Sequence, residues 1–129
     1  MIRQPMIKKS MEIGSIFFLM VKWIVFILMV IFNGIVEEIF WRGYTFGKLG
    51  QHLNKWSTIA VVTVFYTSYH LATILTFFNI SYLSIQMVFF VSIAGLVWGW
   101  MRYFYNNLWA SAIGHTFATI GYMSIYLLL

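Results

Sequence analysis

Long apolar stretches with very few charged side chains are the feature that most constrains the fold of this chain. Residues 13–46 are largely apolar and are interrupted by Lys22, by Asn33-Gly34 and by a pair of glutamates. The whole chain is 62% hydrophobic and 9% charged, whereas a soluble domain has about 45–50% apolar and about 25% charged residues. So few charges cannot cover a water-facing surface. The sequence therefore excludes a soluble domain and predicts a protein whose outer surface contacts lipid.

The length of the chain limits the number of membrane spans. A helix needs about 20 apolar residues to cross a bilayer, so 129 residues allow about four spans and no soluble domain. We expect an all-α, polytopic membrane bundle that forms one domain over residues 1–129, with residues 1–22 as a basic segment at the membrane surface. With an even number of spans, both termini lie on one side. The cations slightly favour cytoplasmic termini, because the cytoplasmic side of membrane proteins carries more Lys and Arg. The side of the termini has four cations, Arg3, Lys8, Lys9 and Lys22, and the opposite side has three, Lys48, Lys55 and Arg102.

Polar breaks in the apolar pattern divide the chain into four helices. We expect Lys22 to extend its ammonium group to one interface, and the first helix to bend near Gly34. An alternative ends this helix near Phe32 and places the glutamates at the water boundary. Ser57 is the expected N-cap of the second helix. The four predicted helices cover about residues 23–46, 57–78, 82–103 and 108–128, with a polar loop over residues 47–56.

Two of the three acidic residues of the chain, Glu37 and Glu38, are adjacent and lie within the first predicted helix. A charge placed inside a bilayer costs about 2.5–3.5 kcal/mol on insertion scales, so such a pair points to a function. Glu38 and Arg42 are four residues apart, so they share a helix face and can form a salt bridge. Glu37 then points about 100° away and is free for another task.

The strongly polar, titratable side chains of the predicted helices come from three of the four helices. Ionisable groups inside spans face the bundle interior and pair with one another, so we expect these side chains to converge. Tyr66 lies one helical turn before His70, and Thr119 lies one turn after His115. The converging residues are predicted to be Glu37, Glu38, Arg42, His70 and His115.

A carboxylate and two imidazoles around one water molecule have the composition of a hydrolytic site. The carboxylate can take a proton from the water, and the imidazoles can stabilise an oxyanion or bind a metal. Glu37, His70 and His115 are ligand types that zinc prefers, so a site with a divalent metal and a metal-free site are both open. Purely structural roles are the alternative: an ion pair that locks the bundle, and histidines that bond neighbouring carbonyls.

Several other classes of protein are disfavoured. The cations do not cluster with aromatic residues on an aqueous face, so no nucleic-acid partner is expected. The chain has no cysteine, which excludes disulfides and thiolate metal sites. The first apolar region is too long for a secretory signal and lacks a small-residue cleavage site, so it is expected to remain as a membrane segment. Oligomeric state and substrate do not follow from the residues.

Three motifs resemble those of one protein family. Residues 37–43, Glu-Glu-Ile-Phe-Trp-Arg-Gly, resemble its EExxxR motif, and Tyr66-Thr67-Ser68-Tyr69-His70 resembles its FxxxH motif with tyrosine in place of phenylalanine. Residues 95–115 resemble its glycine-rich helix and the helix with its last histidine. The family is the CAAX protease and bacteriocin-processing family of intramembrane proteases, also called Abi, and the resemblance covers about residues 23–127.

The resemblance implies a four-helix core with its active site inside the membrane, here expected to be a bacterial cell membrane. It implies an endopeptidase of the metallo- or glutamate type that cleaves a membrane-associated peptide or a prenylated protein, or that processes a bacteriocin. Glu37 would activate the water, Glu38 and Arg42 would orient and support it, and His70 and His115 would complete the site.

One position departs from the family pattern. The family has asparagine four residues after the last histidine, where this chain has Thr119. A threonine hydroxyl cannot reproduce the paired hydrogen bonds of an amide. The alternative function is therefore a catalytically weak or inactive protein of the same fold, such as a bacteriocin self-immunity or membrane-binding protein. A proton-coupled transporter is a third option with less support, because the third predicted helix offers few polar groups for a path.

Overall fold

The computed structural model describes the backbone of residues 3–128 and the side chains within that range except 3–8, 10, 77–78, 125–126 and 128. Every regular element in this described part of the chain is helical. The elements are α1 (Arg3–Ile31), η1 (Phe32–Val36), η2 (Ile39–Thr45), α2 (Phe46–Leu49), α3 (Lys55–Phe78), α4 (Tyr82–Tyr105) and α5 (Leu108–Leu128).

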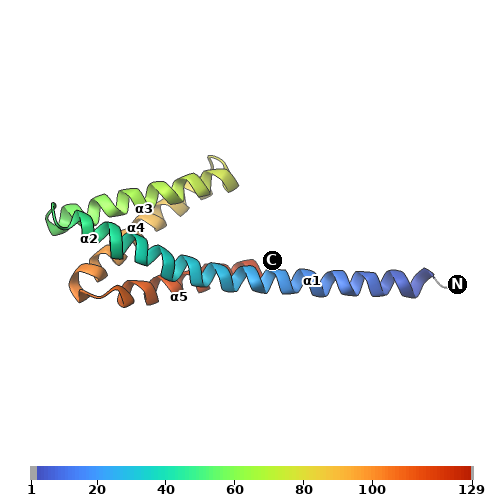
Figure 1. Ribbon diagram of the computed structural model, residues 1–129. Helices are drawn as coiled ribbons and strands as arrows, with labels where there is room; N and C mark the ends of the chain where they lie inside the picture. The colour runs from blue at the N-terminus through green and yellow to red at the C-terminus, as the bar shows by residue number, and fades with distance from the viewer. Residues whose placement is uncertain (1–2, 129) are drawn as a thin grey trace.

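The first long helix is continuous from Arg3 to Leu49 and contains two π-helical segments, η1 and η2. The predicted start near Trp23 was therefore wrong, whereas the helix ends three residues after the predicted Phe46. A single lysine at position 22 does not stop a helix, because no proline or capping residue follows it. The predicted bend near Gly34 falls in η1, where each turn holds an extra residue, and such turns often kink a helix. Figure 1 shows the change of direction between α1 and the segment leading to α2.

The other helices follow the predicted breaks closely. α3 begins two residues before the predicted Ser57, because the N-cap is Asn54, whose side chain accepts a hydrogen bond from the Ser57 N–H at 3.0 Å. The loop between α2 and α3 is therefore shorter than the predicted loop over residues 47–56. α4 begins at the predicted residue, with Ser81 as its N-cap, and continues to Tyr105 before Asn106 in the left-handed region ends it. The predicted bounds of α5 are confirmed.

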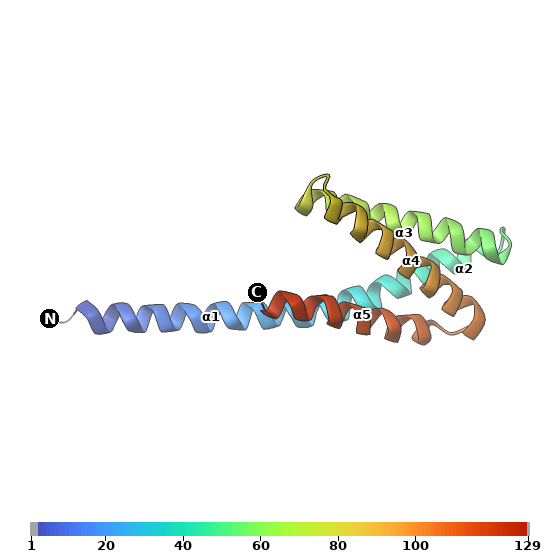
Figure 2. The same cartoon turned by 180° about the vertical axis from the view of Figure 1, so that it is seen from behind.

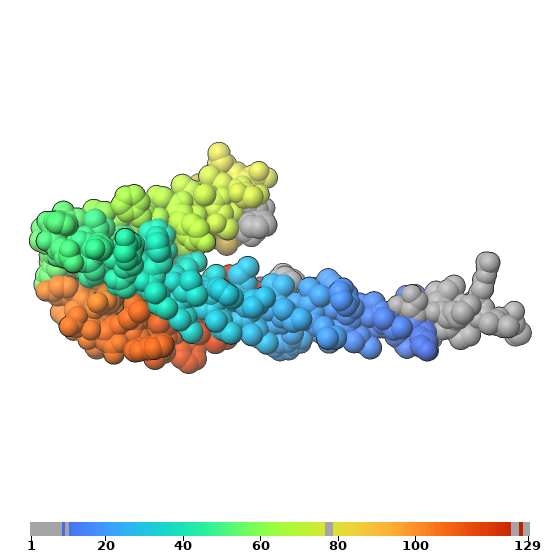
Figure 3. Space-filling model, in the orientation of Figure 1, coloured from blue at the N-terminus to red at the C-terminus, as the bar shows by residue number. Residues whose placement is uncertain are grey.

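The helices form two antiparallel pairs that share one end of the molecule. α3 and α4 make a hairpin, and α5 runs back along the first long helix (Figures 1 and 2). The end of α5 lies beside α1 (Figures 1 and 2). The described part of α1 projects past the rest of the bundle (Figure 3). Apolar side chains on this projection are exposed, including Phe17 at 67%. Water would disfavour such a surface, whereas lipid favours it.

Within the described residues, three helical stretches are long and apolar enough to cross a membrane: Met11–Leu49, Lys55–Thr76 and Tyr82–Tyr105. α5 adds a fourth long helix with no Asp, Glu, Lys or Arg in its sequence. The prediction of an all-α, multi-pass membrane bundle is confirmed. Both glutamates of the pair lie within the first of the three stretches.

Glycines allow the helices to approach closely at two interfaces. A Cβ atom at Gly95 would lie 2.9 Å from Thr63 Cγ2, and one at Gly99 would lie 3.1 Å from Ile59 Cγ2, so α4 meets α3 along these glycines. A Cβ atom at Gly34 would lie 2.8 Å from the backbone Cα of Thr116, and its contact with the threonine hydroxyl would be closer still. The first helix and α5 therefore pack at Gly34.

Substitution Gly34→Ala is expected to lower the free energy of unfolding by about 1–3 kcal/mol, the usual effect of overpacking a close contact. The methyl group would push α5 away from the first helix, because the nearest atoms include backbone. Unfolding in mixed micelles measures the change. The matched control is Gly121→Ala on α5, where a Cβ would meet nothing within 4 Å; an equal loss of stability in both variants would contradict the close contact.

Candidate active site

Glu38 is the centre of a buried charged cluster formed by three helical segments. Its side chain is fully buried, and its Oε1 atom accepts a hydrogen bond from Arg42 Nη1 at 2.8 Å. The same oxygen lies 3.0 Å from Nδ1 of His115 on α5. A carboxylate oxygen only accepts hydrogen bonds, so the hydrogen of His115 lies on Nδ1. The predicted ion pair is present, and it also holds a histidine from a distant part of the chain.

Arg42 connects this cluster to α4 and to α3. Its side chain is fully buried, and its Nη2 donates a hydrogen bond to the backbone carbonyl of Gly95 at 3.2 Å. The guanidinium carbon lies 4.4 Å from the ring centre of Tyr66, a cation–π distance. A single cation thus binds Glu38, the α4 backbone and an aromatic ring of α3.

Glu37 lies on a different side of the helix and faces α3. The closest approach of its carboxylate to a histidine is 3.7 Å, between Glu37 Oε2 and His70 Nε2. His70 Nδ1 lies 3.0 Å from the backbone carbonyl of Tyr66. Because a carbonyl oxygen only accepts, Nδ1 carries the hydrogen and the neutral ring presents an Nε2 lone pair toward Glu37. The adjacent glutamates thus contact histidines from two different helices.

Aromatic rings enclose the two histidines. Tyr66 lies between them, with its ring centre 4.3 Å from that of His70 and 6.1 Å from that of His115. The ring of Trp98 on α4 lies nearly parallel to His115, at 6.1 Å between centres. The spacing predicts that Tyr66 shares a helix face with His70. The contact of Tyr66 with His115 and the position of Trp98 depend on how the helices pack, so the sequence does not predict them. Both rings limit the rotation of the imidazoles.

Arg102 supports the backbone of the site from the end of α4. Its Nε donates a hydrogen bond to the backbone carbonyl of Arg42 at 3.1 Å, and its Nη1 donates to Asn106 Oδ1 at 3.1 Å. Arg42 belongs to the π-helical segment η2, where the regular i to i+4 hydrogen bonds are replaced. The sequence predicts Arg102 only as an interfacial cation, because its position in the last turn of a predicted helix carries no further signal.

Several buried polar atoms of the site have no hydrogen-bond partner among the described residues. They include one oxygen of each glutamate and two N–H donors. Buried polar groups are rarely left unpaired, except where water, a ligand or a reaction uses them. Acceptors and donors are therefore available together in one region. These atoms are Glu37 Oε2, Glu38 Oε2, Arg42 Nε and Trp98 Nε1.

The residues predicted as zinc ligands match a metal site in chemistry but not in position. The two imidazoles have Nδ1 occupied by a carbonyl and a carboxylate, an arrangement typical of histidines that bind metal through Nε2. Within the described residues, however, no group of three or more histidine and carboxylate side chains is placed so that it could hold a metal ion. Glu37, His70 and His115 would have to move to share one ion.

The structure thus brings together Glu37, Glu38, Arg42, His70 and His115, the five residues expected to converge. Thr119 lies one turn beyond His115 and is 2% exposed. It is buried in the bundle on the same helix as His115. The described contacts bring Thr119 to none of the charged atoms of the cluster.

Comparison with known proteins identifies one family. A family model described as type II CAAX prenyl endopeptidase Rce1-like matches residues 19–121. No curated protein and no solved structure matches the chain. The matched region contains all of the residues gathered at the site and most of the described bundle. It confirms the resemblance to the CAAX protease and bacteriocin-processing family. The chain belongs to the Rce1-like family of type II CAAX prenyl endopeptidases.

Proposed function

We propose that this chain is an active intramembrane endopeptidase that hydrolyses a peptide bond near the C-terminus of a membrane-anchored, prenylated CAAX-type substrate. The observation that supports this best is the approach of Glu37 Oε2 to His70 Nε2, at 3.7 Å, inside a bundle that buries few other charges. A purely structural pair would be expected to close to hydrogen-bonding distance. The wider separation suits a shared water molecule.

A water molecule at about 2.8 Å from both atoms would form the apex of a triangle with Glu37 and His70. Both atoms can accept a hydrogen bond, so the water would donate both of its hydrogens. Its lone pairs would then face the substrate carbonyl. Glu37 takes one proton as general base while the water oxygen bonds to the carbonyl carbon. The peptide C–N bond then breaks, and Glu37 passes the proton to the leaving nitrogen.

His115 would stabilise the oxygen of the tetrahedral intermediate. Glu38 and Arg42 hold its Nδ1 side in place, so that Nε2 is the nitrogen available to the substrate. A protonated imidazole carries a hydrogen on each nitrogen, so His115 in that form can donate from Nε2 to this oxygen. A divalent metal such as zinc would supply Lewis acidity if Glu37, His70 and His115 closed around it, and none of the steps above depends on one.

Substrate would enter from the side of the bundle. Figure 3 shows a notch between the first long helix and the C-terminal half of α3, where the two helices diverge. These helices carry Glu37 and His70. A substrate held in the bilayer by its prenyl group would reach a site in this position without leaving the membrane.

The test is reconstitution of the purified chain in liposomes with a farnesylated peptide that ends in a CAAX sequence. We expect release of the C-terminal tripeptide, detected by mass spectrometry, and weaker cleavage of the same peptide without its farnesyl group. A folded, reconstituted protein that leaves the farnesylated peptide intact would contradict the proposal. That outcome would favour the non-catalytic alternative, a self-immunity or membrane-binding protein.

A further inference from the structure

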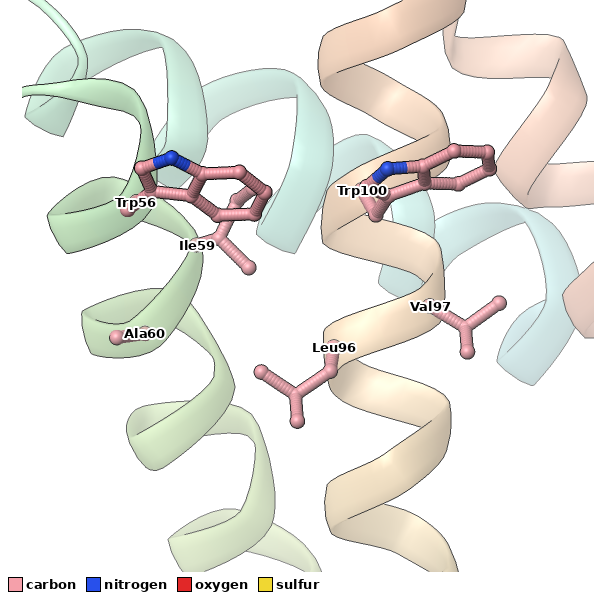
Figure 4. Close-up of a pocket in the computed structure, with 6 residues that line it drawn as sticks. All are labelled: Trp56, Ile59, Ala60, Leu96, Val97 and Trp100. Atoms are coloured by element: carbon pink, nitrogen blue, oxygen red, sulfur yellow. The ribbon is translucent and has the colours of Figure 1, made fainter.

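An apolar groove runs between α3 and α4 on the outer surface of the hairpin. Its volume is about 470 Å³, within the range of small-molecule sites. Figure 4 shows Trp56 on α3 and Trp100 on α4 at one end, with Leu96 pointing toward α3 farther along. The groove lies within two of the stretches that can cross a membrane. Its lining residues are Trp56, Ile59, Ala60, Leu96, Val97 and Trp100.

A lysine stands at the tryptophan end of this groove. The ammonium nitrogen of Lys55 lies 5.0 Å from the ring centres of Trp56 and of Tyr103, and 5.7 Å from that of Phe104. Such contacts hold a cation in place but leave its charge uncompensated. Lys55 is also the first residue of α3. The dipole at the start of a helix favours an anion there, so a cation at this position adds to an already positive potential.

The same end of the bundle has an excess of positive charge. α2 and the end of α4 both lie near the start of α3 (Figure 1). α2 carries Lys48, and the last turn of α4 carries Arg102. No aspartate or glutamate follows Glu38 in the sequence. An acidic side chain from α3, α4 or α5 therefore cannot neutralise Lys55. An anion from outside the chain is the complementary partner.

We propose that this groove is a binding site for an anionic phospholipid, with an acyl chain between α3 and α4 and the phosphate at Lys55. The apolar walls fit a hydrocarbon chain, and the two indoles mark the level of the membrane interface, which tryptophan prefers. Basic pockets between membrane helices bind the head groups of anionic lipids. The site is on the outer surface of the hairpin and is separate from the cluster around Glu38.

The experiment uses the full chain in vesicles of equal parts phosphatidylglycerol and phosphatidylcholine, with one of the two lipids brominated on its acyl chains. Bromine quenches the fluorescence of nearby tryptophans. We expect stronger quenching when phosphatidylglycerol carries the bromine, and loss of that difference when Trp56 and Trp100 are both replaced by phenylalanine. Substitution Lys55→Gln should weaken the preference for phosphatidylglycerol by about fivefold, the contribution of one lysine near a membrane surface.

Two matched controls separate this site from general attraction to a basic surface. Lys48→Gln removes a charge at the same end but outside the groove and should leave the preference unchanged. Ala60→Leu fills the groove and should reduce quenching, whereas Ala72→Leu, exposed farther along α3, should not.

Equal quenching by both brominated lipids, or equal effects of Lys48→Gln and Lys55→Gln, would overturn the proposal. Displacement of phosphatidylglycerol by a farnesylated peptide would also overturn it. The absence of quenching of Trp56 and Trp100 by either lipid would do the same, because that result is expected if protein covers the groove.

Discussion

Substitution Glu37→Gln is expected to lower kcat/KM for a farnesylated CAAX peptide by about 10²–10⁴-fold, the usual contribution of a general base. Glutamine has the same shape but cannot take a proton from water. The Glu37 side chain accepts no hydrogen bond from the described residues through its Oε2 atom, so its replacement removes no hydrogen bond there. We therefore expect the free energy of unfolding to change little, and only the rate of peptide release to fall.

The control for this prediction is Glu12→Gln. Glu12 is the remaining acidic residue of the chain, and it is exposed on the projecting part of α1. The same change of charge there should leave kcat/KM unchanged. Retention of wild-type activity in the Glu37→Gln variant would remove this carboxylate from the mechanism.

Substitution Arg42→Ala is expected to lower the free energy of unfolding by about 3–5 kcal/mol, the usual cost of breaking a buried ion pair from one side. The change removes the hydrogen bonds to Glu38 Oε1 and to the Gly95 carbonyl, together with the contact with the Tyr66 ring. Glu38 would remain fully buried with His115 as its only ionic contact among the described residues. Unfolding in mixed micelles, followed by circular dichroism, measures this loss.

Two comparisons separate the buried pair from a general effect of charge. Lys48→Ala removes an exposed cation from the same long helix and should change the free energy of unfolding by less than about 0.5 kcal/mol. Arg42→Lys should be intermediate, since an ammonium group keeps the charge but lacks the planar, forked donors. If Arg42→Ala were as mild as Lys48→Ala, the pair would not hold the bundle together.

Most of the helical architecture could be predicted because apolar runs and polar breaks mark where membrane helices begin and end. The bounds of α5 and the start of α4 coincide with residues that interrupt the apolar pattern. The start of the first helix could not be predicted in this way, because Lys22 interrupts hydrophobicity without interrupting the backbone hydrogen bonds. The π-helical segments have no distinct periodicity in so short a stretch. They depend on tertiary contacts such as the bond from Arg102 to the Arg42 carbonyl.

The charged part of the site could be predicted for a different reason. Charged side chains buried in a membrane bundle pair with one another, so five polar residues on three helices are expected to gather at one site. Local spacing predicted the contact between Glu38 and Arg42. Which glutamate faces which histidine depends on helix packing, and it appears only in the structure. The roles of the Gly95 carbonyl and of Trp98 also depend on α4, where residues 93–101 contain no charged side chain to signal them.

A double-mutant cycle tests most directly whether Glu37 and His70 hold one water molecule between them. The cycle compares kcat/KM for the wild type, Glu37→Gln, His70→Ala and the double variant. Residues that act as a unit are strongly non-additive. We predict that the double variant is within about twofold of Glu37→Gln alone, the precision of such cycles. Losses that multiply would show that the two residues act independently and would contradict the shared water.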